Sequence, residues 1–158
     1  MFKKYLIVFL ISMVPLIELR GAIPYAVGFG LPIVPSCIVA VLGNMLPVPF
    51  IFLFARKLLE WGKDKPVIGG FFRWCLTKGE KAVRKMEEKA GNGLYVALLL
   101  FVGIPLPGTG AWTGTLAASL LNMDFKKSVI FVMLGVLLAG AIMLAASLGV
   151  FGAISLIR

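Results

Sequence analysis

Hydrophobic residues dominate four blocks of this chain, and polar residues or glycine- and proline-containing breaks separate these blocks. The stretches dominated by apolar residues cover residues 5–17, 31–55, 94–123 and 128–157. About 20 apolar residues are enough for a helix to cross the hydrocarbon core of a bilayer, which is roughly 30 Å thick. The pattern predicts an all-α integral membrane protein, and we interpret residues 1–158 as a single membrane domain.

Two of the blocks contain helix breakers too early for a complete crossing. The first helix should stop at Pro15 after a rise of roughly 20 Å, and a second short helix is expected around residues 24–29. The segment 94–102 rises only about 14 Å before a break at residues 103–114, and a helix over about 109–121 should follow. We interpret each pair as a re-entrant helical hairpin, whose unwound tip must be covered by protein or line a cavity.

The other two blocks are long enough to cross the membrane completely. The first runs over residues 33–55 and the second over residues 128–157. Prolines should kink or fray the first helix, and glycines allow close helix packing in the second. The residues concerned are Pro35, Pro47, Pro49, Gly135, Gly140 and Gly149.

The two halves of the chain share one plan, which indicates an internal repeat. Val14-Pro15-Leu16 aligns with Ile104-Pro105-Leu106 at an offset of 90, and Val41-Leu42-Gly43 aligns with Met133-Leu134-Gly135 at an offset of 92. A half with one hairpin and one crossing passes through the membrane once, so the second half must run in the opposite direction. The sequence therefore predicts two inverted repeats, residues 1–55 and 93–158, joined by a basic amphipathic segment at residues 56–92.

The formal charge of +9 is concentrated in the segment between the repeats. Residues 56–92 hold ten of the sixteen Lys and Arg, against five acids. A basic loop beside apolar helices is typical of the cytoplasmic face of a membrane protein, so we do not expect nucleic acid as a partner. A capping-box pattern at residues 77–80 predicts a helix within this connector.

Lysines near the helix ends leave two topologies open. In the hairpin topology, Lys126 and Lys127 share a side with the connector, as the positive-inside rule requires, whereas Lys3 and Lys4 lie outside. Four complete spans would instead place Lys3 and Lys4 inside. We favour the hairpins, because the nine residues before Gly103 cannot span a bilayer. No signal-peptide cleavage site follows the first apolar segment, so we interpret that segment as retained.

Composition agrees with a membrane protein and argues against an enzyme. Hydrophobic residues make up 60% and charged residues 15% of the chain, with a mean hydropathy of +1.01, whereas about a quarter of a soluble domain is charged. The chain has no histidine, and Cys37 and Cys75 match no metal-ligand or redox spacing. We therefore expect no enzymatic activity, no metal site and no cofactor.

Two charged residues in the first interrupted block form the strongest candidate site. Glu18 is the only carboxylate and Arg20 the only guanidinium in the apolar region formed by residues 1–55, and burying either in hydrocarbon is costly without a partner. Gly21 and Pro24 should keep the backbone non-helical here. The pair can be structural, with Glu18 bound to Arg20 or to the free amides of the opposite hairpin. Alternatively, Glu18 takes up and releases a proton, and Arg20 holds an anionic group or sets the charge state of Glu18.

The break at residues 103–114 should form the opposite tip, unless it is a purely structural turn outside the bilayer. Its prolines end one helix, Gly108 and Gly110 permit unusual backbone conformations, and Thr109 can cap the next helix. The first amides of that helix would attract an anion. Asn44 could contact a substrate or bond to the kinked backbone near Pro47. The candidate substrate-binding residues outside the first tip are Asn44, Pro105, Pro107, Gly108, Thr109, Gly110, Trp112 and Thr113.

These two motifs together resemble a known family. ELRGAIP at residues 18–24 and PLPGTGAWTG at residues 105–114 are similar to motifs of the small multidrug export protein family of bacterial and archaeal membranes, and the likeness covers nearly the whole chain. The layout also resembles the DedA and VTT superfamily, whose members are thought to carry two facing re-entrant hairpins and some of which are linked to moving lipids between leaflets. The Arg-rich motif typical of DedA proteins has no obvious counterpart around Trp112.

The resemblance and the two candidate tips imply a small membrane transporter in the plasma membrane of a prokaryote, with residues 56–92 in the cytoplasm. We expect proton-coupled export of a small or amphiphilic substrate, with Glu18 as the coupling group and Arg20 among the binding residues. A translocase for phospholipid or polyprenyl-phosphate and a non-transporting scaffold are the alternatives. Expected partners are membrane lipids, protons, a substrate and a second copy of the chain, with Gly135 and Gly140 or the crossing helices at the dimer contact.

Overall fold

The computed structural model of this chain describes residues 2–15, 17–64, 69, 70, 73, 77, 93–106 and 108–157. These residues form helices and no strands. The helices are α1 (Phe2–Met13), α2 (Glu18–Gly28), α3 (Ile33–Met45), α4 (Pro47–Gly62), α6 (Gly93–Gly103), α7 (Ala111–Leu120) and α8 (Phe125–Ile157). Most of the connector predicted at residues 56–92, including its capping box apart from Thr77, lies outside the described residues.

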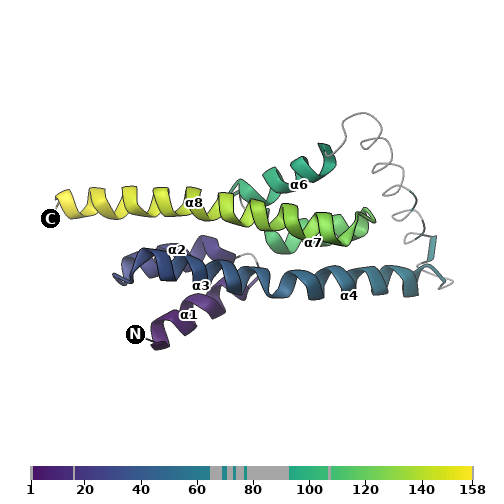
Figure 1. Cartoon of the computed structure of the whole chain (residues 1–158), viewed down its shortest axis with the longest axis horizontal. Helices are drawn as coiled ribbons and strands as arrows, with labels where there is room; N and C mark the ends of the chain where they lie inside the picture. The colour runs from purple at the N-terminus through teal and green to yellow at the C-terminus, as the bar shows by residue number, and fades with distance from the viewer. Residues whose placement is uncertain are drawn as a thin grey trace.

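The short helices form two hairpins, α1–α2 and α6–α7, that open toward opposite ends of the molecule (Figure 1). Their tips meet in the middle, between the long helices (Figure 1). The first helix ends at Met13 because Pro15 has no N–H for a helical hydrogen bond and restricts the residue before it. α2 packs on α8, and α7 packs on α4, so each hairpin also contacts a long helix of the other half of the chain.

The long helices are apolar enough to cross a membrane. α3 and α4 follow one another across Leu46, so that residues Ile33–Gly62 form a nearly continuous run of 30 residues, and α8 contains an apolar stretch, Phe125–Val150, of 26 residues. The interruption expected at Pro47 is present, since α3 ends at Met45 and α4 begins at Pro47. Pro35 and Pro49 lie in the first turns of their helices, where backbone N–H groups have no partner within the helix.

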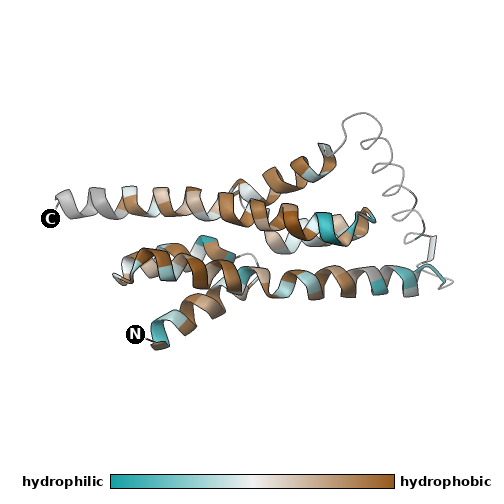
Figure 2. Cartoon of the chain, in the orientation of Figure 1, coloured by the Kyte–Doolittle hydropathy of each residue, from teal (hydrophilic) through white to brown (hydrophobic). Residues whose placement is uncertain are grey.

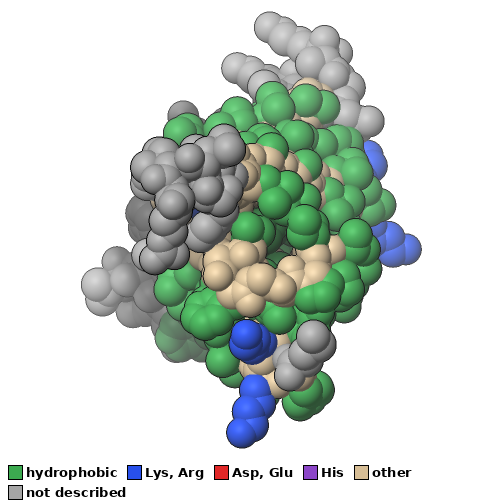
Figure 3. All heavy atoms as spheres, turned by 90° about the vertical axis from the view of Figure 1, so that its left-hand side faces the viewer, with side chains coloured by type: hydrophobic (Ala, Val, Ile, Leu, Met, Phe, Trp, Pro, Cys, Tyr) green, Lys and Arg blue, Asp and Glu red, His purple; other side chains and the backbone are tan. Residues whose placement is uncertain are grey.

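Most residues of these helices are hydrophobic (Figure 2), and hydrophobic side chains cover much of the face of the molecule that Figure 3 shows. Only 33% of the most apolar stretch of Ile33–Gly62, and 28% of that of α8, is buried within the chain. Phe50 and Phe54 are each 70% exposed, and Ile130 is 57% exposed. The core helix of a soluble protein would be mostly buried, whereas large contiguous apolar surfaces are typical of membrane-facing or partner-facing helices. The surface indicates a membrane protein.

The break in the first hairpin lies earlier than the sequence predicted. Gly21 and Pro24 were expected to keep the backbone non-helical, but both lie inside α2, which begins at Glu18. Proline and glycine within an apolar helix are tolerated when neighbouring helices pack around them, and Ala22 and Ile23 in this helix are buried. The loss of one hydrogen bond at Pro24 is therefore outweighed by packing.

Two glycines bring the hairpins against the long helices. A Cβ atom on Gly43 would lie 2.6 Å from the Phe9 carbonyl oxygen, and a Cβ atom on Gly135 would lie 2.8 Å from the Leu99 carbonyl oxygen. α3 thus packs closely on α1 and α8 on α6, and the close packing predicted at Gly135 is confirmed. Gly135 meets α6 of its own chain, so it is not free to contact a second copy as expected. The equivalent point on Gly140 is 3.9 Å from Ile23, and Gly149 has nothing within 4 Å among the described residues.

Candidate functional site

The carboxylate of Glu18 binds the first turn of α7 in the opposite hairpin. Its Oε2 atom accepts a hydrogen bond from the amide of Ala111 at 3.2 Å, and its Oε1 atom accepts one from the amide of Trp112 at 3.0 Å. Glu18 is 3% exposed. The first amides of a helix have no partner within the helix, and they carry the positive end of its dipole. Glu18 therefore caps α7 from another part of the chain.

Gly110 makes this approach possible. It is the residue before α7, with φ 142° and ψ −173°, a conformation that only glycine adopts readily. A Cβ atom at this position would also lie 2.7 Å from Oε1 of Glu18. Both the backbone geometry and the space require glycine here. The unusual conformations predicted for Gly108 and Gly110 are confirmed, since Gly108 has φ 82°.

Arg20 holds the other side of the same turn. Its Nη2 atom donates to Oγ1 of Thr109 at 2.7 Å, and its Nη1 atom donates to the carbonyl oxygen of Leu106. A planar guanidinium can make two such hydrogen bonds in a fixed geometry. Glu18 and Arg20 thus bind different groups around one turn. Glu18 accepts hydrogen bonds from backbone amides, and Arg20 donates hydrogen bonds to a carbonyl and a hydroxyl oxygen.

Thr109 does not cap α7 as the sequence suggested. Gly110 occupies the capping position and offers no side-chain hydrogen bond. The Thr109 hydroxyl instead lies 2.9 Å from the carbonyl oxygens of Ile104 and Leu106, at the end of α6. It therefore closes the turn and accepts a hydrogen bond from Arg20, while the carboxylate of Glu18 replaces it as the cap.

The other predicted site residues are distributed between the tips and the surrounding helices. Pro105 is half-buried in the α6–α7 turn, Gly108 is exposed there, and the Thr113 hydroxyl points back to the carbonyl of Gly110 at 3.4 Å. Gly21 packs under Ile17 within the first hairpin. Pro24 lines a groove between α2 and α8, so the structure does not bring it to the tip contact. Pro107 lies outside the described residues.

Several buried polar atoms near these helices have no hydrogen-bond partner in the described part of the chain. They include Oδ1 of Asn44, Nε1 of Trp112 and Oγ1 of Thr115. Asn44 and Thr115 are each 1% exposed. Buried polar groups are normally paired, and an unpaired one retains the capacity to bind a ligand or water. Asn44 was expected to contact a substrate or to bond to the nearby backbone. Its Oδ1 atom makes no hydrogen bond to the described backbone.

The arrangement is a pair of complementary charges inserted between two helix tips. The negative charge faces the positive end of α7, and the positive charge faces the oxygens at the end of α6. Hydrogen bonds to charged groups contribute more than neutral ones, about 1.5–3 kcal/mol each. These contacts hold the tips together in the conformation described here. The described residues contain no group of three His, Cys, Asp or Glu side chains that could hold a metal ion.

Sequence reasoning anticipated one set of backbone groups in the site and missed the other. The free amides of the opposite hairpin were one of the alternatives given for Glu18, and those of Ala111 and Trp112 do bind it. The carbonyl of Leu106, which accepts a hydrogen bond from Arg20, was not expected, because this residue has no side chain that suggests a site. The signal was present in the glycine before Ala111 and in the unpaired amides expected after the turn. Those amides were expected to attract an anion, and the anion is Glu18 itself.

Comparison with known proteins identifies one family. Residues 18–142 match the family described as "Putative small multi-drug export protein". The matched segment begins at Glu18, and it includes Arg20, the α6–α7 turn and about the first half of α8. No curated protein and no solved structure matches the chain.

Proposed function

This chain belongs to the small multi-drug export protein family, and we propose that it is a proton-coupled exporter of a small or amphiphilic substrate. The observation that carries the proposal is the contact between Glu18 and the first turn of α7. A titratable carboxylate buried in an apolar protein, at the point where two broken helices meet, is the arrangement expected of a transport site.

The proposed placement in the membrane makes both hairpins re-entrant. α1 has 12 residues and α6 has 11, which correspond to roughly 18 and 16 Å of helix, so neither crosses a bilayer alone. Lysines lie over aromatic rings at the two open ends, with Lys4 5.4 Å from the ring of Phe29 and Lys127 5.5 Å from that of Tyr95. Lysines and aromatic residues are typical of the two membrane–water interfaces.

The proposed inverted repeat is supported by the glycine contacts. Gly43 packs on Phe9, and Gly135 packs on Leu99. The offsets between these pairs are the 92 and 90 residues at which the sequence motifs align. The long helices that carry the two glycines run in opposite directions (Figure 1). Residues 1–55 and 93–158 are then two copies of one unit, inserted from opposite sides.

In the proposed mechanism, proton binding to Glu18 separates the tips. A neutral carboxylic acid has one oxygen fewer to accept hydrogen bonds from the amides of Ala111 and Trp112. It also interacts less strongly with the dipole of α7 than the carboxylate does. Separation gives a substrate access to the amides of α7 and to the unpaired groups of Trp112 and Thr115. A substrate bound to these groups keeps the tips apart after the proton has left Glu18, so proton and substrate stabilise the separated state in turn. This exchange couples the entry of the proton to the export of the substrate.

The alternatives have less support. A lipid translocase needs a cation for the phosphate, and both terminal nitrogens of Arg20 already bind Leu106 and Thr109. A scaffold function would depend on residues 56–92, most of which the structure does not describe.

The proposal is tested with purified protein in proteoliposomes that carry an imposed pH gradient, using the cationic amphiphile ethidium as the transported probe. We expect gradient-driven ethidium flux from the unmodified chain and at least a tenfold loss of that flux in Glu18→Gln, because the glutamine amide cannot exchange a proton. Glu18→Asp should retain part of the gradient dependence.

Asp64→Asn is the matched control, since it removes an exposed carboxylate beyond the end of α4, and its flux should equal that of the unmodified chain. Full gradient-driven flux in Glu18→Gln would exclude Glu18 as the coupling group. Absence of flux from every protein, with ethidium or with a panel of amphiphilic cations and anions, would contradict the proposal as a whole.

A further inference from the structure

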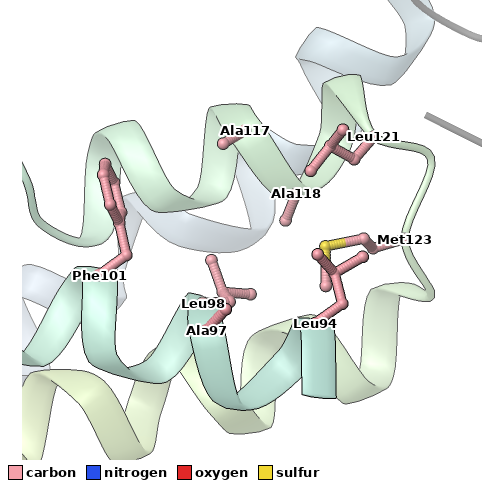
Figure 4. A pocket seen from close by; sticks show the side chains of 8 residues that line it. All are labelled: Leu94, Ala97, Leu98, Phe101, Ala117, Ala118, Leu121 and Met123. Atoms are coloured by element: carbon pink, nitrogen blue, oxygen red, sulfur yellow. The ribbon is translucent and has the colours of Figure 1, made fainter. Parts of the chain in front are cut away.

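An apolar groove lies between the two helices of the second hairpin, away from the tips (Figure 4). Near the tip the helices touch, because a Cβ atom on Gly114 would lie 2.5 Å from a methyl group of Val102. Toward the open end they diverge, and small side chains leave a volume of about 210 Å³. The groove is lined by Leu94, Ala97, Leu98, Phe101, Ala117, Ala118, Leu121 and Met123.

The lining of this groove is compatible with a hydrocarbon chain and with little else. Each lining side chain is apolar, so the groove offers no hydrogen bond to a polar ligand. In a bilayer, transfer of a chain from lipid into the groove brings no hydrophobic gain, since lipid tails are equally apolar. Its contribution is shape: an acyl chain seated between Leu98 and Ala118 gains dispersion contacts along its length. Selectivity for one lipid must therefore come from the headgroup.

Two exposed lysines lie where such a headgroup would be. Met123 lines the groove, and Lys126 and Lys127 follow it three and four residues later, in the first turn of α8. The ammonium group of Lys127 is 5.5 Å from the ring of Tyr95, the neighbour of Leu94 at the rim of the groove. The acid nearest to these lysines in the sequence is Asp124. Its carboxylate accepts a hydrogen bond from the amide of Lys127 at 2.9 Å and so caps α8, and it also reduces the local positive charge.

We propose that this groove binds one acyl chain of an anionic phospholipid whose phosphate lies on Lys126 and Lys127. The charge of the lysines is complementary to the headgroup, and juxtamembrane basic residues are attracted to anionic leaflets. The inference depends on membrane insertion but not on transport, because neither lysine contacts the tips. The lipid would hold the open end of the α6–α7 hairpin, where Ala97 and Ala117 leave the helices apart.

Native mass spectrometry of the purified full chain tests the site with phosphatidylglycerol and phosphatidylcholine of identical acyl chains. We expect at least one adduct with a preference for phosphatidylglycerol. The double variant Lys126→Gln/Lys127→Gln should lose about tenfold of the phosphatidylglycerol affinity and keep that for phosphatidylcholine. Ala97→Phe, which fills the groove from an exposed position, should weaken both adducts.

The controls are Lys3→Gln/Lys4→Gln at the other end of the molecule and Ala141→Phe on an exposed face of α8. Neither should change the adducts. An equal loss of phosphatidylglycerol in the Lys3/Lys4 control would show non-specific attraction to positive charge and overturn the proposal. Unchanged lipid adducts in Ala97→Phe would also overturn the proposal. If Ala97→Phe converts dimers to monomers while lipid adducts persist, the groove is a contact with a second copy, and the lipid site is excluded.

Discussion

At the scale of single residues, the site depends on backbone conformations that its sequence makes possible. Glu18 has φ 51°, a left-handed conformation that is unfavourable for a residue with a side chain by about 1–2 kcal/mol. Its two hydrogen bonds to α7 offset this strain, and they are available because Gly110 lets the carboxylate approach. The charge and the glycine, which lie 92 positions apart, therefore form one structural unit.

Gly110→Ala should be among the most destabilising substitutions in the described part of the chain. We expect a loss of about 3 kcal/mol in unfolding free energy, because a Cβ atom both strains the backbone and displaces the carboxylate of Glu18. Denaturant titration of the helical circular dichroism signal in detergent micelles measures the effect.

Substitutions at two other glycines distinguish the cost of backbone strain from the cost of losing the Glu18 contact. Gly30 has φ 64° and nothing within 4 Å, so Gly30→Ala should cost only about 1 kcal/mol of backbone strain. Gly149 is helical and open, so alanine there should be neutral or stabilising. A loss at Gly110 no greater than that at Gly30 would mean that the Glu18 contact contributes nothing to stability.

At the scale of helices, the sequence predicted which elements exist better than where they end. The short and long apolar blocks correspond to α1, α6, α3–α4 and α8, since block length is a property of the sequence itself. The start of α2 at Glu18 was missed, because glycine and proline at positions 21 and 24 indicate a break and only the surrounding helices remove it. The partners of Glu18 could be offered only as alternatives, because they are backbone amides in the other half of the chain.

The close contacts of the long helices predict matching effects in the two halves. Gly43→Ala and Gly135→Ala should each destabilise the chain by about 1–3 kcal/mol, because the added methyl group meets a carbonyl oxygen of α1 or α6. Gly140→Ala, with 3.9 Å of space, is the control and should be neutral. Denaturant titration of the helical circular dichroism signal in detergent micelles measures these changes in unfolding free energy. A large effect at one position and none at the other would argue against equivalent halves.

At the scale of the whole molecule, the direction of each half decides which ends share a side of the membrane. The N-terminus of α1 and the start of α3 lie at one end, and the end of α4 and the start of α8 lie at the other (Figure 1). Four plain spans would pair these points differently, with Lys4 beside Lys63 and Val34 beside Asp124. The proposed hairpins pair Lys4 with Val34 and Lys63 with Asp124.

Cysteine accessibility distinguishes the two arrangements. In a chain with Cys37 and Cys75 replaced by serine, single cysteines at Lys4, Val34 and Asp124 should react with a membrane-impermeant maleimide on intact cells in the pattern of the hairpins. Lys4→Cys and Val34→Cys should label together, and Asp124→Cys only after permeabilisation. Labelling of Val34→Cys together with Asp124→Cys, and apart from Lys4→Cys, would exclude re-entrant hairpins.

The crossed tip contacts also have a consequence for biosynthesis. Residues 1–55 are translated before residues 93–158 and contain both charges, yet the partners of these charges within the described residues are Leu106, Thr109, Ala111 and Trp112. Until translation has passed residue 112, the carboxylate and the guanidinium of the first hairpin lack these partners. If the hairpins are re-entrant as proposed, stable insertion of the first one must therefore wait for the second half of the chain.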